Sequence, residues 1–260
     1  MENALQVLKD VYVLRTKIAN VCFIGEQGSS DWVLIDAGVK GSADQVKETA
    51  NSLYGDLPPR AIILTHAHFD HVGTLKDLLQ EWEAPVYAHS EEIPYITGKK
   101  NYPKPDPSVG GGIMSRLSPL FPNEAIDVTP LAMTLPEDGE IPFLPKWRYI
   151  HTPGHTKGHI SLYRESDHAL IAGDAFITVK QESLLAVLTQ EKEIHGPPAY
   201  FTPDWKSSWS SVKKLASLEP ETAVTGHGLP MTGQELKDGL KKLAAEFDKL
   251  AIPDEGKYIE

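Results

Sequence analysis

The sequence predicts an α+β fold in four layers, αββα, in which helices flank two mixed β-sheets. Three observations lead to this prediction. Strand signals occur in runs in both halves of the chain, helical patterns lie between and after these runs, and 260 residues suit one layered core. We therefore expect a single domain over residues 1–260.

The first half begins with apolar, β-branched runs separated by polar or glycine-containing breaks, which indicate a β-meander. The helical spacing of Ala43, Val46 and Ala50 predicts the next element, with Ser42 as N-cap and Gly55 as the stop. The predicted elements of this half are strands at 11–15, 19–25 and 31–38, a helix at 42–55, a strand at 60–65, a helix at 74–82 and a strand at 85–89.

Strand signals return after a long connection, and helices follow them. Each of the later strands ends near a histidine or an aspartate. The predicted elements are strands at 148–152, 159–164 and 168–176, a helix at 204–218, a strand at 222–226 and a helix at 233–250.

The connection at about 94–136 is rich in Pro, Gly and Ser and is long for a compact domain, which favours a lid or substrate-pocket insertion. Within it, residues 110–121 could form a short amphipathic helix. Its apolar side chains, which would face a pocket or a partner, are Ile113, Met114, Leu117 and Leu120. A surface excursion that packs its own small cluster is the alternative.

Composition narrows the classes of function. The net charge of -11 opposes binding to a nucleic-acid backbone, and no apolar run is long enough to cross a bilayer. The N-terminus shows no export signal, so we expect a cytoplasmic protein that acts on a small molecule, as a monomer or homodimer. Cys22 is the only cysteine and lies in a predicted strand, where it would pack as a small hydrophobic residue.

The strongest chemical signal is a cluster of four potential metal ligands directly after an apolar strand: His66, His68, Asp70 and His71. Alternate residues of a strand share a face, so His66 and His68 can bind one metal ion. Asp70 and His71, at the turn that follows, can reach a second ion. Three histidines and one aspartate this close together have little structural use, which favours a catalytic metal site.

Three further ligand candidates follow strands downstream. His155 follows a Pro-Gly turn that would direct its side chain out of the loop. Asp174 ends an apolar strand, and a carboxylate there must be paired, capped or metal-bound. His227 lies between two glycines at the end of another strand. For His151 and His159 we expect hydrogen bonds to ligands or places in the strands.

These motifs, in this order, resemble those of the metallo-β-lactamase superfamily over about residues 10 to 230. The resemblance implies that His66, His68 and His155 bind one metal ion, that Asp70, His71 and His227 bind a second, and that Asp174 bridges the two. A bridging aspartate is found in the glyoxalase II-like thioesterases and lactonases of the superfamily and not in its true β-lactamases. The diiron reductases of the superfamily have a glutamate where this chain has His68.

The resemblance implies a hydrolase with two divalent metal ions, for which zinc is the first expectation and iron or manganese also suit the ligands. Two ions that share a water would supply hydroxide at neutral pH to attack a carbonyl, and Asp70 would carry a proton to the leaving group. We expect an ester or lactone with an apolar portion. The alternatives are a thioester, a β-lactam and, less favoured, non-haem iron redox chemistry. Tyr200 and Phe201 either line the pocket or pack in the core.

Overall fold

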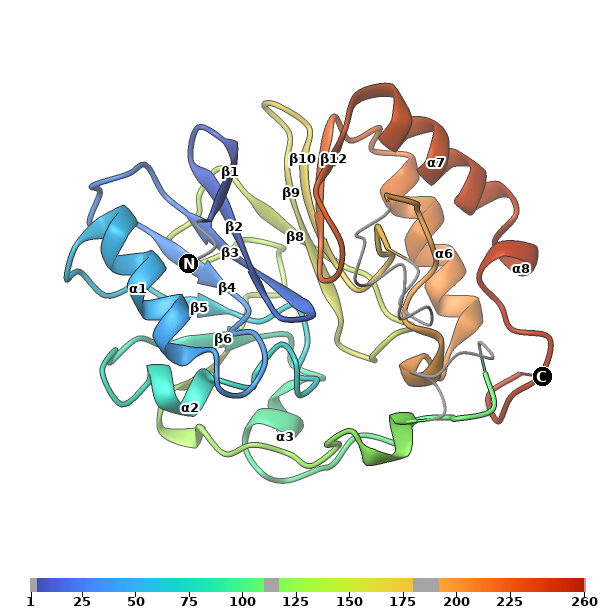
Figure 1. Cartoon of the computed structure of the whole chain (residues 1–260), viewed down its shortest axis with the longest axis horizontal. Coiled ribbons are helices and arrows are strands. Elements are labelled where there is room, and N and C mark those ends of the chain that lie inside the picture. The colour runs from blue at the N-terminus through green and yellow to red at the C-terminus, as the bar shows by residue number, and fades with distance from the viewer. Residues whose placement is uncertain (1–3, 110–116, 180–191, 260) are drawn as a thin grey trace. The chain divides into compact units, whose positions relative to one another are not determined.

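The computed structural model describes residues 4–109, 117–179 and 192–259. The chain divides into two compact units. The first comprises Met1–Tyr102 with Glu124–Pro145, and the second comprises Pro103–Asn123 with Lys146–Glu260. Each unit contains one β-sheet and the helices that pack on it (Figure 1). The expectation of a single domain over 1–260 stays a prediction.

The sheet of the first unit is mixed. Among the described residues it has seven strands, which follow one another across the sheet in chain order: β1 (Leu5–Leu8), β2 (Val11–Thr16), β3 (Ala19–Ile24), β4 (Val33–Ile35), β5 (Ile62–Ile63), β6 (Val86–Ala88) and β7 (Ala132–Thr134). β1 to β4 form an antiparallel meander, and β4 to β7 are parallel. The parallel strands require crossover connections, which contain α1 (Ala43–Tyr54), α2 (Leu75–Leu78) and α3 (Ile93–Ile96).

The core of the first unit lies between its sheet and α1 and α2. Trp32 is fully buried in it, stacks on Tyr54 with ring centroids 4.5 Å apart and meets Trp82 edge-on at 5.7 Å. The indole N–H of Trp32 donates to the carbonyl of Leu57 at 3.1 Å, so the ring fills the core without an unsatisfied donor. Cys22, on the other side of the sheet, is also buried, and β4 is therefore covered on both faces.

The sheet of the second unit is also mixed. Within the residues that the structure describes, its strands run in the order β12 (Met231–Thr232), β11 (Thr222–Thr225), β10 (Ala169–Gly173), β9 (Ile160–Arg164) and β8 (Arg148–His151). Only β10 and β11 are parallel, and α6 (Trp205–Ala216) connects them. α6, α7 (Gly233–Ala245) and α8 (Phe247–Leu250) pack on this sheet through a second hydrophobic cluster (Figure 1).

The two mixed sheets with their helices confirm the predicted α+β class. The elements differ in detail: β1, α3, β7 and β12 were not predicted, and the last predicted helix is interrupted at Glu246. β7 lies within the segment 94–136, pairs with β6 and completes the first sheet, while the lid or pocket role of this segment stays a prediction. A strand of three residues carries too little periodicity to be recognised in a sequence.

The predicted helix at 110–121 falls partly outside the described residues, which exclude Ile113 and Met114. Its end forms the 3₁₀ turn η1 (Ser118–Leu120), and the side chains of Leu117 and Leu120 are 43% and 79% exposed. The other 3₁₀ turns are η2 (Thr129–Leu131) and η3 (Ala199–Phe201).

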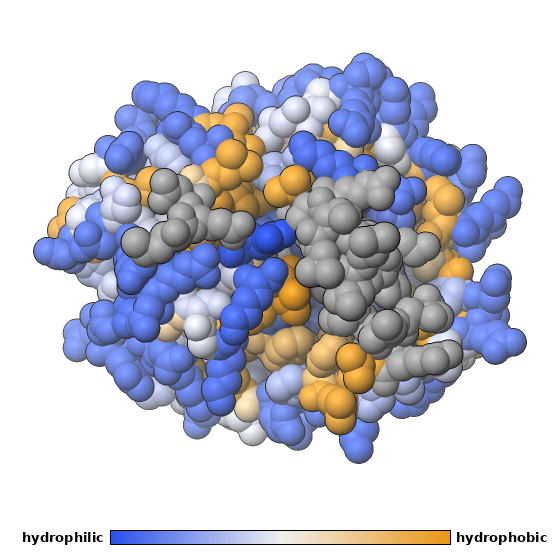
Figure 2. Space-filling model, viewed as in Figure 1, coloured by the Kyte–Doolittle hydropathy of each residue, from blue (hydrophilic) through white to orange (hydrophobic). Residues whose placement is uncertain are grey.

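The surface of the molecule is consistent with its charged composition. Hydrophilic side chains predominate on the face drawn in Figure 2, with apolar patches between them. In the part of the chain that the structure describes, no helix has both the length and the apolar character to cross a bilayer.

Replacing Trp32 with alanine is expected to lower the free energy of unfolding by about 3–5 kcal/mol, because it leaves a cavity among fully buried rings. Chemical denaturation measures this change. Leu57→Ala, which truncates a 44% exposed side chain and keeps the carbonyl that Trp32 bonds, is expected to change the stability by less than about 0.5 kcal/mol. Equal effects of the two substitutions would contradict the packing described.

Cys22 is expected to resist thiol reagents while the protein is folded. Burial, and to a lesser extent the Asp36 carboxylate, raise the pKa of its thiol, so the reactive thiolate is suppressed. Below the ordinary thiol pKa of about 8.5, the reaction rate of the unfolded chain should rise roughly tenfold per pH unit. The folded protein at pH 8 should react at least about 100-fold more slowly than protein unfolded in guanidinium. Similar rates would place the thiol at the surface.

Candidate metal centre

Four candidate ligands of the first unit lie in the loop after β5, and all four are buried. The rings of His66 and His68 meet edge-on with centroids 4.8 Å apart, and His66 and His71 are 4.1 Å apart. A ligand atom of His66 lies within 4.8 Å of one in His68, and also within 4.8 Å of one in His71. A ligand atom of Asp70 lies within the same distance of one in His71. The turn is closed by the backbone N–H of His71, which donates to the carbonyl of His68 at 2.9 Å.

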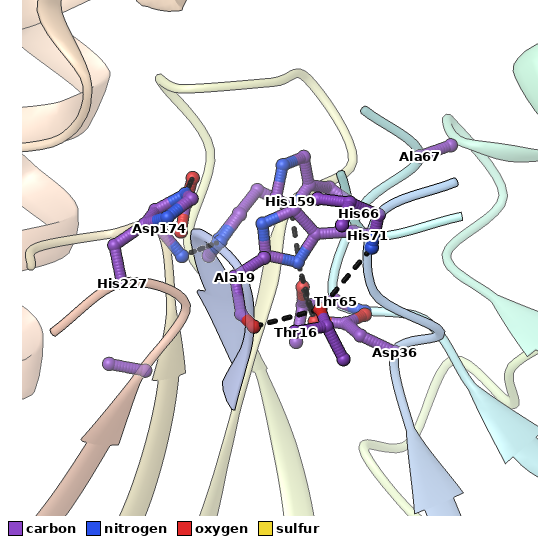
Figure 3. A network of polar contacts seen from close by, with 12 residues as sticks. Thr16, Ala19, Asp36, Thr65, His66, Ala67, His71, His159, Asp174 and His227 are labelled. Carbon is purple, nitrogen blue, oxygen red and sulfur yellow. Dashed lines mark hydrogen bonds and ion pairs between the residues drawn. The ribbon is translucent and has the colours of Figure 1, made fainter. Parts of the chain in front are cut away.

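Asp36, at the end of β4, orients two of these histidines (Figure 3). Its Oδ1 accepts from the backbone N–H of Thr65 at 2.8 Å, and its Oδ2 accepts from Thr65 Oγ1 at 2.7 Å and from His71 Nδ1 at 2.8 Å. Because Thr65 gives its hydroxyl proton to the carboxylate, its oxygen must accept from His66 Nδ1, 3.1 Å away. His66 and His71 therefore present the Nε2 lone pair as the ligand atom.

A second buried carboxylate holds the backbone between His66 and His68. The N–H of Ala67 donates to Glu92 Oε2 at 3.0 Å, and the hydroxyl of Tyr102 donates to the same oxygen. Burial and the Glu92 carboxylate raise the pKa of Tyr102, which therefore remains a hydrogen-bond donor. The ring of Tyr102 lies against His68, with centroids 4.4 Å apart, and fixes that imidazole from the side.

The remaining candidate ligands, His155, Asp174 and His227, are buried together in the second unit. His155 Nε2 lies 3.4 Å and His227 Nε2 lies 3.1 Å from one oxygen, Oδ2 of Asp174. Ligand atoms that surround one tetrahedral ion at about 2 Å are roughly 3.3 Å apart. The carbonyl of His227 accepts from Thr225 Oγ1 at 2.7 Å and from the N–H of Thr178 at 3.2 Å, which fixes the loop.

His155 owes its position to a close backbone approach and to one hydroxyl. Gly154 has a φ of 136°, and a side chain there would meet Ser208 at 2.1 Å, so only glycine fits before His155. Thr202 Oγ1 donates to the carbonyl of Pro198 at 2.8 Å and therefore accepts from His155 Nδ1 at 3.1 Å. His155 thus also presents its Nε2 lone pair.

His159 hydrogen-bonds to a candidate ligand, and His151 is the last residue of β8. The backbone N–H of Asp174 donates to His159 Nε2 at 2.9 Å, so the proton of His159 lies on Nδ1 and is donated to Thr152 Oγ1 at 2.8 Å. His159 is therefore a support for Asp174. His151 is exposed, and its Nε2 donates to the carbonyl of Lys157 at 2.8 Å.

The donor set of the second unit fits a divalent metal ion. His155 Nε2 lies 3.4 Å from Asp174 Oδ2, a contact that is favourable when a positive charge lies between them, either a bound metal ion or a second proton on the imidazole. Imidazole nitrogen and carboxylate oxygen are ligands that zinc, iron and manganese share. The Asp36 and Thr202 contacts meet a further requirement, that the second ring nitrogen of a ligand histidine be held by an oxygen acceptor.

Sequence comparison identifies the family. A family model described as the metallo-beta-lactamase superfamily matches residues 15–227. The chain belongs to the metallo-beta-lactamase superfamily. It is 49% identical over 247 residues to the probable metallo-hydrolase YflN of Bacillus subtilis (strain 168), an alignment that covers 94% of each chain.

Solved structures of this superfamily share the fold. TTHA1623 in a di-iron-bound form is 26% identical, with a TM-score of 0.55 over 85% of this chain and 92% of that one. The B3 metallo-beta-lactamase BLEG-1 is 25% identical, with a TM-score of 0.58 and the same coverages. Family, names and ligand groups together support a metal-dependent hydrolase, while the metal roles of the seven individual residues stay predictions.

The residues that support the candidate ligands were not predicted from the sequence. They are Asp36, Thr65, Glu92, Tyr102 and Thr202. Asp36 carried a usable signal, because it ends a buried apolar strand in the same way as Asp174. The others lie beside the ligands only through tertiary contacts.

Replacing Asp36 with asparagine is expected to weaken zinc binding about 10- to 100-fold, because an amide cannot accept all three hydrogen bonds that reach the carboxylate. Competition with a chromophoric chelator measures the affinity. Asp31→Asn is the matched control, because that exposed side chain lies away from the histidines and forms an ion pair with Arg60 at 3.7 Å. Equal affinities of the two variants would refute the orienting role of Asp36.

Proposed function

We propose that this member of the superfamily is a dinuclear metal-dependent hydrolase that cleaves a carbonyl ester, most favourably a lactone or carboxylic ester with an apolar portion. The proposed ligands are His66, His68 and His155 for the first ion, Asp70, His71 and His227 for the second, and Asp174 between them. Zinc is the proposed metal, and the di-iron form of TTHA1623 makes iron the first alternative.

The observation that carries the proposal is the orientation of the imidazoles. In His66, His71 and His155 an oxygen acceptor holds the proton on Nδ1, so Nε2 is left to bind a metal ion. A hydrogen-bonding role alone would not require three histidines with the same protonated nitrogen in two separate units.

When bound, two divalent ions supply a nucleophilic hydroxide near pH 7 and polarise a carbonyl. Asp70 is buried in the loop that carries the histidines, and its carboxylate is proposed to accept a proton from the attacking water and return it to the leaving oxygen. The side chains of Asp36 and Thr202 hold the ligand rings fixed, which limits reorganisation during the reaction.

Apolar side chains of the second unit support an apolar substrate. Leu117 and Leu120 are exposed, and next to them in the chain Phe121 lies 6.0 Å from Tyr200 and 6.3 Å from Phe201 between ring centroids. Tyr200 is buried in the core cluster, which favours a packing role. The exposed leucines are proposed to contact the acyl or alkyl portion of the ester.

Thioesters and β-lactams are the alternative substrates. A bridging aspartate is expected in thioesterases and lactonases of the superfamily, so Asp174 favours these over β-lactams. The likeness to BLEG-1 keeps β-lactam hydrolysis as a secondary activity. Iron-dependent redox chemistry is less favoured, because all seven ligand positions of the dinuclear hydrolases carry a suitable residue.

The net charge bears on the class of substrate. The net charge of -11 favours a small-molecule substrate over nucleic acid, and we propose a cytoplasmic enzyme that is independent of membranes, as a monomer or homodimer.

Substituting Asp174 with alanine is expected to reduce the metal content from about two equivalents to one or fewer and to lower ester hydrolysis at least about 100-fold, because the proposed bridge is lost. Elemental analysis and assays on lactones, aryl esters, thioesters and a β-lactam, with and without chelator, measure both effects. His151→Ala is the control, because its ring is exposed and donates to the loop carbonyl of Lys157.

Two results would count against this function. An Asp174→Ala variant with unchanged metal content and rate would remove the bridging assignment. Wild-type protein that holds one iron, consumes oxygen and hydrolyses none of the panel would place the chain among the oxidoreductases.

A further inference from the structure

Asp106 is a buried carboxylate on the segment that enters the second unit, and it joins three parts of that unit. Its side chain is almost fully buried. Oδ1 accepts from the N–H of Ser108 at 3.0 Å and from Ser108 Oγ at 2.5 Å, and Oδ2 accepts from the backbone N–H of Lys257. Its own N–H donates to the carbonyl of Tyr200 at 2.8 Å. Asp106 therefore ties residues near the end of the chain to η3.

Residues 251–259, which we call the strap, contact this region at further points. The hydroxyl of Tyr258 donates to the carbonyl of Lys104 at 3.3 Å. Ala251 packs directly on Gly196, where an added Cβ would approach the Ala251 Cβ to 2.4 Å. The strap thus touches both the segment that carries Asp106 and the segment that leads into η3.

The turn pinned by Asp106 ends at the residue that orients His155. The N–H of Thr202 donates to the carbonyl of Ala199 at 3.3 Å, and Thr202 Oγ1 donates to the carbonyl of Pro198 at 2.8 Å. The same hydroxyl oxygen accepts from His155 Nδ1 at 3.1 Å. A shift of the Tyr200 carbonyl would therefore move Thr202 and change the direction of the imidazole.

We propose that Asp106 is a positioning residue through which the strap sets the orientation of His155 and hence the affinity of the metal site. This inference rests on the proposed function, because it takes His155 as a metal ligand. The carboxylate accepts donors on both oxygens at once, whereas an amide would point its own N–H groups at one of these donors.

The ionisation of Asp106 is secured by its partners. Burial by itself would raise the pKa of this carboxyl, but the hydrogen bonds from Ser108 and from the backbone of Lys257 outweigh it and lower the pKa. The strap is thus held by a charged acceptor throughout the neutral pH range.

The chain contains a matched control for Asp106. Asp127 accepts from the N–H of Thr129 at 3.0 Å and from Thr129 Oγ1 at 2.6 Å, which is the same local turn. Asp127 is exposed and lies in the first unit. The zinc affinity of Asp127→Asn therefore shows the effect of weakening such a local turn alone.

A second pair of variants separates the backbone bond from the side chain. Lys257→Pro removes the N–H that Asp106 accepts, whereas Lys257→Ala keeps it and removes only an exposed side chain. Because residue 257 lies at the exposed end of the strap, both variants are expected to fold even if Asp106→Asn does not.

The test is zinc affinity of the full chain by chelator competition, with the thermal midpoint of the metal-free protein as the control for folding. Asp106→Asn and Lys257→Pro should weaken zinc binding about 3- to 10-fold, less than the loss of a direct ligand partner. Asp127→Asn and Lys257→Ala should change it less than 2-fold, on the order of surface substitutions.

A double variant decides whether Asp106 acts through Thr202. Asp106→Asn combined with Thr202→Val should bind zinc about as weakly as Thr202→Val alone, because both changes act on one contact. The inference would be overturned if the losses of zinc affinity in the double variant multiplied, or if Lys257→Pro and Lys257→Ala bound zinc equally well. The proposed function would stay intact in either case, as long as the wild type binds zinc. A wild type that binds no zinc, iron or manganese would instead refute the proposed function.

Discussion

A buried carboxylate is stable only where donors surround it, and Asp36 meets this requirement with three of them from two other residues. The same contacts fix the proton on Nδ1 of His66 and His71. The donors that stabilise the buried Asp36 carboxylate therefore also orient two candidate ligands. Its positive φ of 61° is an uncommon conformation for a residue with a side chain, and the surrounding bonds maintain it. The orientation of the candidate ligands in the first unit depends on this interaction.

In the second unit, neutral groups orient the candidate ligands. Thr202 orients His155, and His159 holds the backbone of Asp174 while giving its own proton to Thr152. Each threonine hydroxyl that accepts from a histidine donates its own hydrogen bond to a backbone carbonyl or to another hydroxyl. These buried groups therefore have hydrogen-bond partners. Rings held in this way lose little freedom when a metal ion binds, which supports the proposal of a metal-dependent hydrolase.

Two of the residues that support His155 lie at different distances from it. Thr202 touches His155 directly, whereas Asp106 acts two steps away through the η3 turn. Interactions at the greater distance have smaller effects, but they connect the metal site with residues close to the end of the chain. Variation in residues 251–259 would then change metal affinity without altering any ligand.

The sequence alone determined the α+β class, the seven candidate ligands and the superfamily, because strand periodicity and closely spaced histidines are local patterns. It also placed the buried Cys22 correctly. It did not give β7, a strand of three residues defined by its pairing with β6, nor the supporting roles of Glu92, Tyr102 and Thr202. Those depend on contacts between residues 10 to 47 positions apart. Such contacts leave no periodic trace in the sequence, so only the tertiary structure decides which way each imidazole faces.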